Sequence, residues 1–271
     1  MNNNVRIMIG TGVSASKDKD DLIKIIGAGL DGNVFGFDTA PSYKSEKLLS
    51  QVLNECCAKR NIPREKLFIQ TKIDAWQMQQ GNIKQFLDKA LSDMQLNYLD
   101  SLLIHWPVPE YFEETWSRLV DFKKSGVVKN IGVCNVRKRH IVKLLASNDR
   151  PDIIQIERNP LRTCDDEISL CKENNIIIQS YSPLCKMDKR IADDPSINQI
   201  AKAHGKSIGQ VVLRWHIDTG AVPIYTSRKP ERIAEYADIF DFELSSAEIS
   251  QISKLNQNFK LYLESIACPG I

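Results

Sequence analysis

The feature that most constrains the fold is the alternation of short apolar runs with longer amphipathic segments along the whole chain. Eight runs rich in β-branched or aromatic residues are predicted strands. They span residues 6–9, 34–37, 67–71, 101–104, 130–133, 153–156, 176–180 and 221–224. Segments with helical periodicity separate or follow them, at residues 20–30, 46–59, 84–96, 113–124, 138–146, 166–174, 208–218 and 230–238.

This alternation predicts parallel strands, because the tight two-residue turns of antiparallel hairpins are missing. Eight repeats predict an α/β fold, a closed (β/α)8 TIM barrel, and 271 residues are enough for one. A doubly wound open sheet is the alternative, but no dinucleotide-type glycine fingerprint follows the first strand. Helical patterns at 195–204 and 245–255 exceed the eightfold count and are predicted peripheral helices. With no linker, we expect a single domain over residues 1–271.

Composition excludes several classes of function. A net charge of +2 gives no basic surface for nucleic acid, and no window approaches the roughly 18 apolar residues of a membrane helix. The start, MNNNVRIMIGTGV, lacks the pattern of a secretory signal. Seven scattered cysteines lack the paired spacing of a zinc site, so we expect free thiols, no metal and a cytoplasmic protein.

Polar residues end several of the apolar runs. Asp38 ends VFGFD, Lys72 ends LFIQTK and His105 follows SLLI, while Tyr43 lies five residues beyond Asp38. In a parallel barrel the carboxyl ends of the strands meet at one face, where catalytic groups gather. We therefore expect these four side chains to lie together.

An acid, a lysine, a histidine and a tyrosine at one place form a proton-transfer site. The ammonium of Lys72 is expected to lower the pKa of Tyr43 from about 10, with Asp38 keeping the lysine charged. His105 can hydrogen-bond a substrate oxygen. Taken singly, each has a structural alternative: Asp38 as a turn residue, His105 as a buried histidine, Tyr43 as a packing residue and Lys72 as a surface lysine. Their shared location favours the catalytic interpretation.

The same segments resemble those of the aldo-keto reductase superfamily, and the resemblance covers nearly the whole chain in order. FDTAPSY resembles the signature around the catalytic aspartate and tyrosine, and FIQTK and LLIHWP resemble the segments of the catalytic lysine and histidine. The resemblance implies a catalytic tetrad of Asp38, Tyr43, Lys72 and His105. It also implies reduction of aldehydes or ketones by hydride transfer from a nicotinamide cofactor, with Tyr43 as the general acid.

Two further segments resemble the part of the family's site that holds the nicotinamide. In GVCN, Cys134 stands where serine is usual and Asn135 is retained, with Gln155 at the next expected position. A thiol is a weak hydrogen-bonding group, so carboxamide binding is expected to rest mainly on Asn135 and Gln155. SYSPL resembles the stretch whose tyrosine stacks on the nicotinamide ring, which implies this role for Tyr181, with Ser182 and Leu184 beside it.

The segment IYTSRKPERIAEY resembles the family's stretch for the adenosine end of the cofactor. Thr226 stands where a lysine is common and Tyr236 where an asparagine is common. Arg232 can hold a 2′-phosphate bidentately, which implies NADP(H) rather than NAD(H), although NAD(H) stays possible. The cofactor residues implied here are Ser227, Arg228, Arg232 and Glu235, with Lys229 as additional charge.

The substrate side of the site is less determined by the sequence. Trp76, Trp106 and Tyr111 are candidate pocket aromatics. Arg158 and Asn159 stand where many relatives carry an aromatic residue and a histidine, and the tail after Asn256 is short. We therefore expect an open pocket that accepts small carbonyl compounds such as aldehydes, α-dicarbonyls and keto-sugars.

Two other functions remain open from the sequence. One is a lyase whose Lys72 forms a Schiff base, which a charged partner at Asp38 disfavours. The other is a non-catalytic barrel that binds the nicotinamide cofactor and regulates a partner, which the intact tetrad disfavours. In any of these roles we expect a monomer or a weak oligomer.

Overall fold

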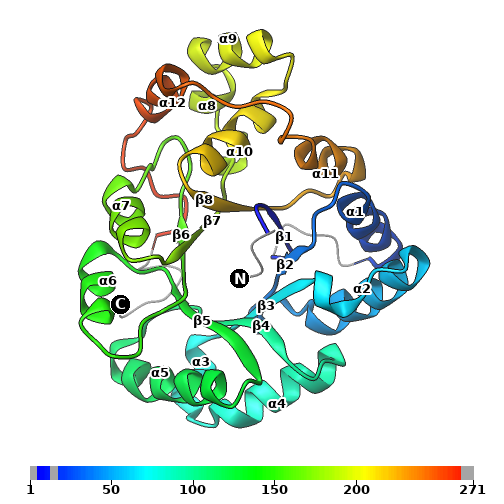
Figure 1. Cartoon of the computed structure of the whole chain (residues 1–271), viewed down its shortest axis with the longest axis vertical. Coiled ribbons are helices and arrows are strands. Elements are labelled where there is room, and N and C mark those ends of the chain that lie inside the picture. Colours follow the sequence, from blue (N-terminus) through cyan, green and yellow to red (C-terminus); the bar gives the residue numbers. More distant parts are fainter. Residues whose placement is uncertain (1–4, 13–17, 264–271) are drawn as a thin grey trace.

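The computed structural model describes residues 5–12 and 18–263. Its centre is a closed barrel of eight parallel strands that pair in sequence order, with the last strand pairing with the first (Figure 1). The predicted barrel is therefore confirmed, and each predicted strand is present. The strands are β1 (Met8–Gly10), β2 (Gly36–Asp38), β3 (Phe68–Ile73), β4 (Leu99–Ile104), β5 (Val128–Cys134), β6 (Ile153–Glu157), β7 (Ile177–Tyr181) and β8 (Ala221–Tyr225).

Helices surround the barrel and bury apolar faces against it. They are α1 (Lys19–Asp31), α2 (Glu46–Arg60), α3 (Ala75–Gln80), α4 (Ile83–Met94), α5 (Pro109–Lys124), α6 (Lys138–Leu145), α7 (Asp165–Glu173), α8 (Lys189–Ala192), α9 (Pro195–His204), α10 (Ile208–Asp218), α11 (Pro230–Ala237) and α12 (Ser246–Ser253). All ten predicted helical segments are present. The sequence missed the short helices α3 and α8, because four to six residues carry too little periodicity.

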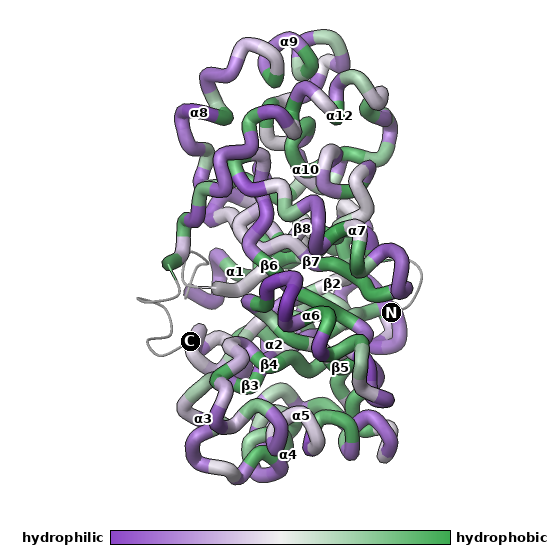
Figure 2. Tube along the Cα trace, turned by 90° about the vertical axis from the view of Figure 1, so that its left-hand side faces the viewer, coloured by the Kyte–Doolittle hydropathy of each residue, from purple (hydrophilic) through white to green (hydrophobic). Residues whose placement is uncertain are grey.

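The two supernumerary helices lie outside the ring, as predicted. α9 and α12 pack together beside α10 at one end of the long axis (Figures 1 and 2). They share a second hydrophobic cluster around Trp215, with Ile197 from α9 and Ile252 from α12. The predicted capping box at the start of α12 is also present, since Ser245 caps the backbone N–H of Glu248. That the whole of residues 1–271 is one domain stays a prediction.

The interior of the barrel changes from apolar to polar toward the carboxyl ends of the strands. Side chains alternate between the two faces of a strand, so every second residue points inward. Along β3 the order is Phe68, Gln70, Lys72; along β6 it is Ile153 followed by Gln155. The apolar interior cluster consists of Met8, Phe68, Leu103, Cys134, Ile153 and Ile224. Below the polar positions the barrel is therefore a packed core.

Gly132 in β5 lies where the neighbouring strands approach so closely that there is no room for a side chain. A Cβ added there would lie 2.1 Å from the carbonyl oxygen of Ile153 and 2.8 Å from Cδ2 of Leu103. Because a backbone atom cannot move aside, we expect Gly132→Ala to lower the free energy of unfolding by about 1–3 kcal/mol. Urea unfolding followed by tryptophan fluorescence measures this.

Gly27→Ala in α1 is the matched control for Gly132→Ala. The closest atom to its added Cβ is the flexible end of Arg60, at 3.0 Å, and alanine is the better helix former. We expect this variant to be as stable as the wild type. Equal stabilities of the two variants would contradict the proposed strand contact.

Candidate active site

A buried ion pair lies at the carboxyl ends of β2 and β3. Lys72 Nζ donates to both carboxylate oxygens of Asp38, at 2.8 and 2.7 Å, and to the carbonyl oxygen of Thr39 at 2.9 Å. The lysine side chain is 0% exposed and that of Asp38 is 6% exposed. Burial, the largest single effect, lowers the pKa of Lys72, but the charge of Asp38, the nearby Tyr43 and Cys134 and the hydrogen bond to Asp38 together outweigh it, and the pKa is raised. The lysine is therefore charged at neutral pH.

Three glutamines complete the hydrogen bonding around this pair. Gln70 and Gln155 both donate to Oδ1 of Asp38, at 2.7 and 3.2 Å. Both also donate to Oε1 of Gln179 in β7, which in turn donates to Gln70 at 3.0 Å. Gln155 was predicted as a carboxamide ligand, whereas sequence reasoning missed the other two. The available signal was a glutamine inside each of the runs FIQTK, IIQIE and IIQSY.

Tyr43 lies beside the ion pair in the short 3-10 turn Pro41–Tyr43. The Lys72 ammonium is 5.0 Å from the centroid of its ring. Burial nevertheless raises the pKa of Tyr43 to about 12, with Lys72 opposing the rise. The expectation of a lowered pKa is therefore wrong, because desolvation of the phenolate outweighs the neighbouring cation. The phenol is protonated at neutral pH.

His105 follows β4 and faces Tyr43 edge-on, with ring centroids 5.7 Å apart. Its Nδ1 is hydrogen-bonded to Asp74, which follows β3 and was missed by the sequence analysis. Burial lowers the pKa of His105 against the opposing effect of Asp74. The imidazole is therefore neutral at neutral pH.

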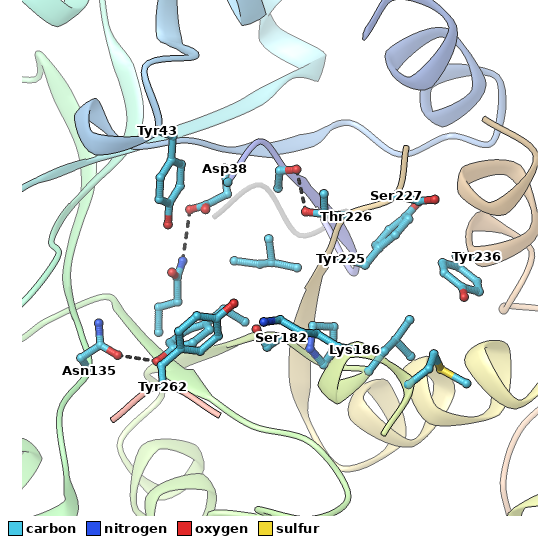
Figure 3. Close-up of a pocket in the computed structure, with 18 of the residues that line it drawn as sticks. Asp38, Tyr43, Asn135, Ser182, Lys186, Tyr225, Thr226, Ser227, Tyr236 and Tyr262 are labelled. Carbon is cyan, nitrogen blue, oxygen red and sulfur yellow. Dashed lines mark hydrogen bonds between the residues drawn. The ribbon is translucent and has the colours of Figure 1, made fainter. Parts of the chain in front are cut away.

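Of these groups, Asp38, Tyr43, His105 and Gln155 line a cavity of about 520 Å³ at the mouth of the barrel. Lys72 lies behind Asp38 and does not line it. Figure 3 shows Tyr43 and Asp38 at one side of the cavity and Ser227 and Tyr236 at the other, with Lys186 between them. The predicted residues that line this cavity are Asp38, Tyr43, His105, Trp106, Asn135, Gln155, Tyr181, Ser182, Leu184, Ser227 and Arg232.

Asn135 and Tyr181 are joined to the catalytic end. The hydroxyl of Tyr181 donates to Oδ1 of Asn135 at 2.7 Å, and Asn135 Nδ2 donates to the carbonyl oxygen of His105 at 2.8 Å. Asn135 has a left-handed backbone with a φ of 59°, a conformation that asparagine tolerates better than most residues. The two predicted nicotinamide residues are thus held in one network with His105.

Three predicted cofactor residues do not line the cavity. Cys134 points into the apolar barrel interior and is completely buried. Glu235 accepts a hydrogen bond from Ser207 at the start of α10, which turns its carboxylate away from the cavity. Arg228 is an exposed residue of the loop after β8. The family pattern marked their positions along the chain but not the direction of their side chains.

Two predicted pocket aromatics also lie elsewhere. Trp76 is 48% exposed, packs edge-on against Phe86 and lines a second cavity of about 380 Å³ on the outer side of β3. Tyr111 belongs to α5 and packs against the outer hydrophobic core. Of the three candidates, Trp106 alone lines the main cavity, because it directly follows His105 at the end of β4.

Arg158 and Asn159 are buried rather than facing a substrate. Arg158 donates to Thr163 O, His216 Nδ1 and Thr219 Oγ1 at 2.8 to 3.0 Å. His216 in turn lies 3.2 Å from the carbonyl oxygen of Pro183, in the loop after Tyr181. The departure from the family pattern at position 158 therefore connects, through His216, to the loop after Tyr181.

The short tail still reaches the cavity, which the sequence did not predict. Glu157 at the end of β6 accepts hydrogen bonds from the backbone N–H groups of Leu261 and Tyr262, at 2.7 and 3.0 Å. The ring centroids of Tyr262 and Tyr181 are then 6.1 Å apart, and Tyr262 lines the cavity. The pocket is therefore partly covered on this side.

Comparison with known proteins explains this arrangement. A model of the Aldo/keto reductase family matches residues 6–257. The chain belongs to the aldo/keto reductase family. It is therefore an oxidoreductase that reduces carbonyl compounds with a nicotinamide cofactor, as the sequence predicted.

Relatives of this family match almost the full length of the chain. Methylglyoxal reductase DkgA of Escherichia coli O157:H7 is 35% identical over 95% of this chain and 92% of its own length. Glyoxal reductase of Bacillus subtilis is 35% identical over 92% of this chain and 88% of its own length. The solved structure of Bombyx mori aldo-keto reductase AKR2E4 in complex with NADP has a TM-score of 0.87 and 31% identity, over 96% of this chain and 92% of that one.

The residues around the cavity fit NADP(H), the cofactor of this aldo/keto reductase. Asn135 and Gln155 line the cavity together with Asp38, Tyr43 and His105, and Gln155 donates to Asp38. Lys186 lies between the two ends, and Arg232 also lines the cavity. These two cations match a dinucleotide that carries a pyrophosphate and a further phosphate. No helix among the described residues is long and apolar enough to cross a membrane.

Asp38→Asn tests the buried ion pair of this reductase. Removing one partner leaves Lys72 buried without a counter-charge, so we expect the free energy of unfolding at pH 7 to fall by about 3–5 kcal/mol. Urea denaturation measures this. The wild-type lysine has a raised pKa and loses its contribution to stability only above the ordinary value of 10.5. The deficit of the variant should therefore narrow at alkaline pH.

Asp88→Asn is the control for Asp38→Asn, because Asp88 forms an exposed ion pair with Lys84 at 2.6 Å. Exposed pairs contribute little, so its unfolding curve should match that of the wild type. A deficit no larger for Asp38→Asn than for Asp88→Asn would contradict the role given to the buried pair.

Proposed function

We propose that the chain reduces small aldehydes and α-dicarbonyls with NADPH, and that Tyr43, Lys72, Asp38 and His105 carry the chemistry. The observation that supports this most is the buried Asp38–Lys72 pair beside the Tyr43 phenol at the wall of the cavity. The names of the relatives, methylglyoxal reductase and glyoxal reductase, support a small dicarbonyl substrate.

The proposed chemistry follows from the charges around Tyr43. When bound, the nicotinamide supplies the hydride that reduces the carbonyl carbon. Tyr43 donates its proton to the carbonyl oxygen, since a pKa of about 12 keeps the phenol protonated at neutral pH. Lys72 stabilises the phenolate that remains, and Asp38 holds the lysine charged and in place.

The alternatives have less support in these contacts. A Schiff base would require a neutral Lys72, whereas Asp38 raises the pKa of the lysine. A non-catalytic sensor would not require the four groups to lie together at one end of the cavity. We therefore propose catalysis rather than regulation or lyase chemistry.

The cofactor contacts proposed here differ in part from the family pattern. Asn135, Gln155 and Tyr181 lie where the nicotinamide would be held, and Arg232 would hold the 2′-phosphate. Lys186 would contact the pyrophosphate. In the segment for the adenosine end, Thr226 stands where a lysine is common; it has no charge to offer a phosphate, and its hydroxyl donates to Gly10 O at 2.8 Å. Sequence reasoning missed Lys186, although it stands directly in the predicted loop after SYSPL.

Location and assembly complete the proposal. The described cysteines are free thiols, which suits the reducing cytoplasm. We propose a cytoplasmic monomer or weak oligomer, which size-exclusion chromatography of the purified protein can test.

Tyr43→Phe tests the proposed acid. It removes the only proton that the mechanism delivers, so turnover of methylglyoxal should fall roughly a hundredfold or more while NADPH affinity stays nearly unchanged. Steady-state assays of NADPH oxidation measure the turnover, and fluorescence titration measures the affinity for NADPH. Tyr98→Phe is the control, since it removes a buried hydroxyl that has no hydrogen-bond partner among the described residues. Near-normal turnover by Tyr43→Phe would refute the proposed function.

Lys186→Ala and Arg232→Ala separate the two cofactor phosphates. The pyrophosphate is common to NADPH and NADH, so Lys186→Ala should weaken the binding of both cofactors by about tenfold. Arg232→Ala should weaken the binding of NADPH by a similar factor and leave the affinity for NADH unchanged. Lys189→Ala, an exposed lysine outside the cavity, is the control. Fluorescence titration gives the Kd values, and an unchanged NADPH affinity in Lys186→Ala would exclude the proposed contact.

A further inference from the structure

Asp74 holds both loops that carry the proposed proton-transfer residues. It follows β3, and its backbone N–H donates to Gln77 Oε1 at 2.9 Å. Its Oδ2 accepts from the backbone N–H of Ser42 at 2.7 Å, and its Oδ1 accepts from the Ser42 hydroxyl at 3.2 Å and contacts His105 Nδ1. Ser42 directly precedes Tyr43. One buried carboxylate thus fixes the tyrosine loop and the histidine ring together.

The contact determines which ring nitrogen of His105 carries the proton. Burial would raise the pKa of the Asp74 carboxyl, but hydrogen bonds from His105 and Ser42 outweigh it, and the pKa is lowered. An ionised carboxylate can only accept hydrogen bonds, so Nδ1 must carry the proton. In the neutral ring Nε2 is then an acceptor. It lies on the ring edge away from Asp74, and His105 lines the cavity.

We propose that Asp74 is a positioning residue that makes His105 Nε2 a hydrogen-bond acceptor, and that the site therefore prefers carbonyl compounds bearing a hydroxyl on the adjacent carbon. The substrate class is α-hydroxy aldehydes and α-hydroxy ketones, together with the hydrated form of α-dicarbonyls. Tyr43 donates to the carbonyl oxygen, and Nε2 accepts from the neighbouring hydroxyl. This inference rests on the proposed function.

The edge-on arrangement of Tyr43 and His105 suits such a substrate. The two rings are neighbours, at 5.7 Å between centroids, and both residues line the cavity. In the proposal Tyr43 is the donor and His105 Nε2 the acceptor. A simple aldehyde satisfies the Tyr43 donor and leaves Nε2 without a donor from the substrate. An α-hydroxy aldehyde satisfies both, and differential hydrogen bonding of this kind is an effective means of selecting substrates.

The preference should depend on pH through His105. The charged or titratable groups that face this ring are Asp74 and Asp38, which raise its pKa, Lys72, which lowers it, and the Tyr43 phenol. With burial included, the pKa lies below the ordinary value of 6.5. As the pH falls through it, the ring gains a proton and Nε2 becomes a donor. The wild-type preference for hydroxylated substrates should therefore weaken on acidification.

Asp74→Asn is the decisive variant. The backbone N–H of Ser42 requires an oxygen acceptor, so the amide NH2 must face His105 and donate to Nδ1, which moves the ring proton to Nε2. We expect the ratio of kcat/KM for glycolaldehyde over propionaldehyde to fall by about five- to tenfold. Steady-state NADPH oxidation with the two aldehydes, which are similar in size, measures it.

The tautomer can also be observed directly in the protein without substrate. The chain has four histidines, so 15N-edited NMR with His105→Gln for assignment identifies the ring. We expect a protonated Nδ1 and a bare Nε2 in the wild type at pH 7.5, and the reverse in Asp74→Asn. The wild-type spectrum is informative even if the variant does not fold.

Glu248→Gln is the matched control, because Glu248 forms the same kind of carboxylate–imidazole pair with His204, at 2.8 Å, in the peripheral helices. Its substrate ratio should equal that of the wild type. A wild-type ring protonated on Nε2, or an unchanged ratio in Asp74→Asn, would overturn this inference. Full turnover by Tyr43→Phe would instead overturn the proposed function, so the two failures can be told apart.

Discussion

The site depends on a single buried ion pair, Asp38 with Lys72. Two charges in a barrel interior are tolerable only when each is fully paired and hydrogen-bonded, because desolvation costs several kcal/mol per ion. Gln70 and Gln155 donate further hydrogen bonds to the carboxylate, and Gln179 accepts a hydrogen bond from each of these two glutamines. These groups come from four different strands, so the closed barrel is what brings them together. The chemistry at the mouth thus rests on a polar layer that the register of the strands holds in place.

Two carboxylates at this mouth act on different partners. Asp38 faces an amine and keeps it charged, whereas Asp74 faces an imidazole that burial keeps neutral. Tyr43 lies between the two systems and remains protonated, because the cost of burying a phenolate exceeds the attraction of Lys72. In the proposed mechanism Tyr43 is therefore a weak acid whose conjugate base is stabilised in place, rather than a strong acid. This arrangement suits a reaction in which negative charge develops on oxygen only as the hydride is transferred.

Site residues that directly follow an apolar run could be identified from the sequence. The direction in which a side chain points could not be predicted as well. Asp38, Lys72 and His105 could be found because parallel strands place their carboxyl ends at one face. Asp74 could not, because an aspartate before a helix is also typical of a cap, and only the fold brings it to His105. Cys134 and Glu235 match family positions yet turn away from the cavity, since burial and a local hydrogen bond decide their orientation. Trp76 was predicted to line the substrate pocket but does not, because its helix α3 lies on the outer side of the barrel.

Glu157 attaches the end of the described chain to the barrel through main-chain N–H groups alone. An anchorage of this kind is indifferent to which side chains the attached segment carries. Substitutions at residues 261 and 262 can therefore alter the outer wall of the pocket while these two hydrogen bonds stay in place, and a change at Tyr262 also removes its ring contact with Tyr181. Substitutions in this segment of the barrel rim can therefore change the range of substrates without changing the residues of the proposed mechanism.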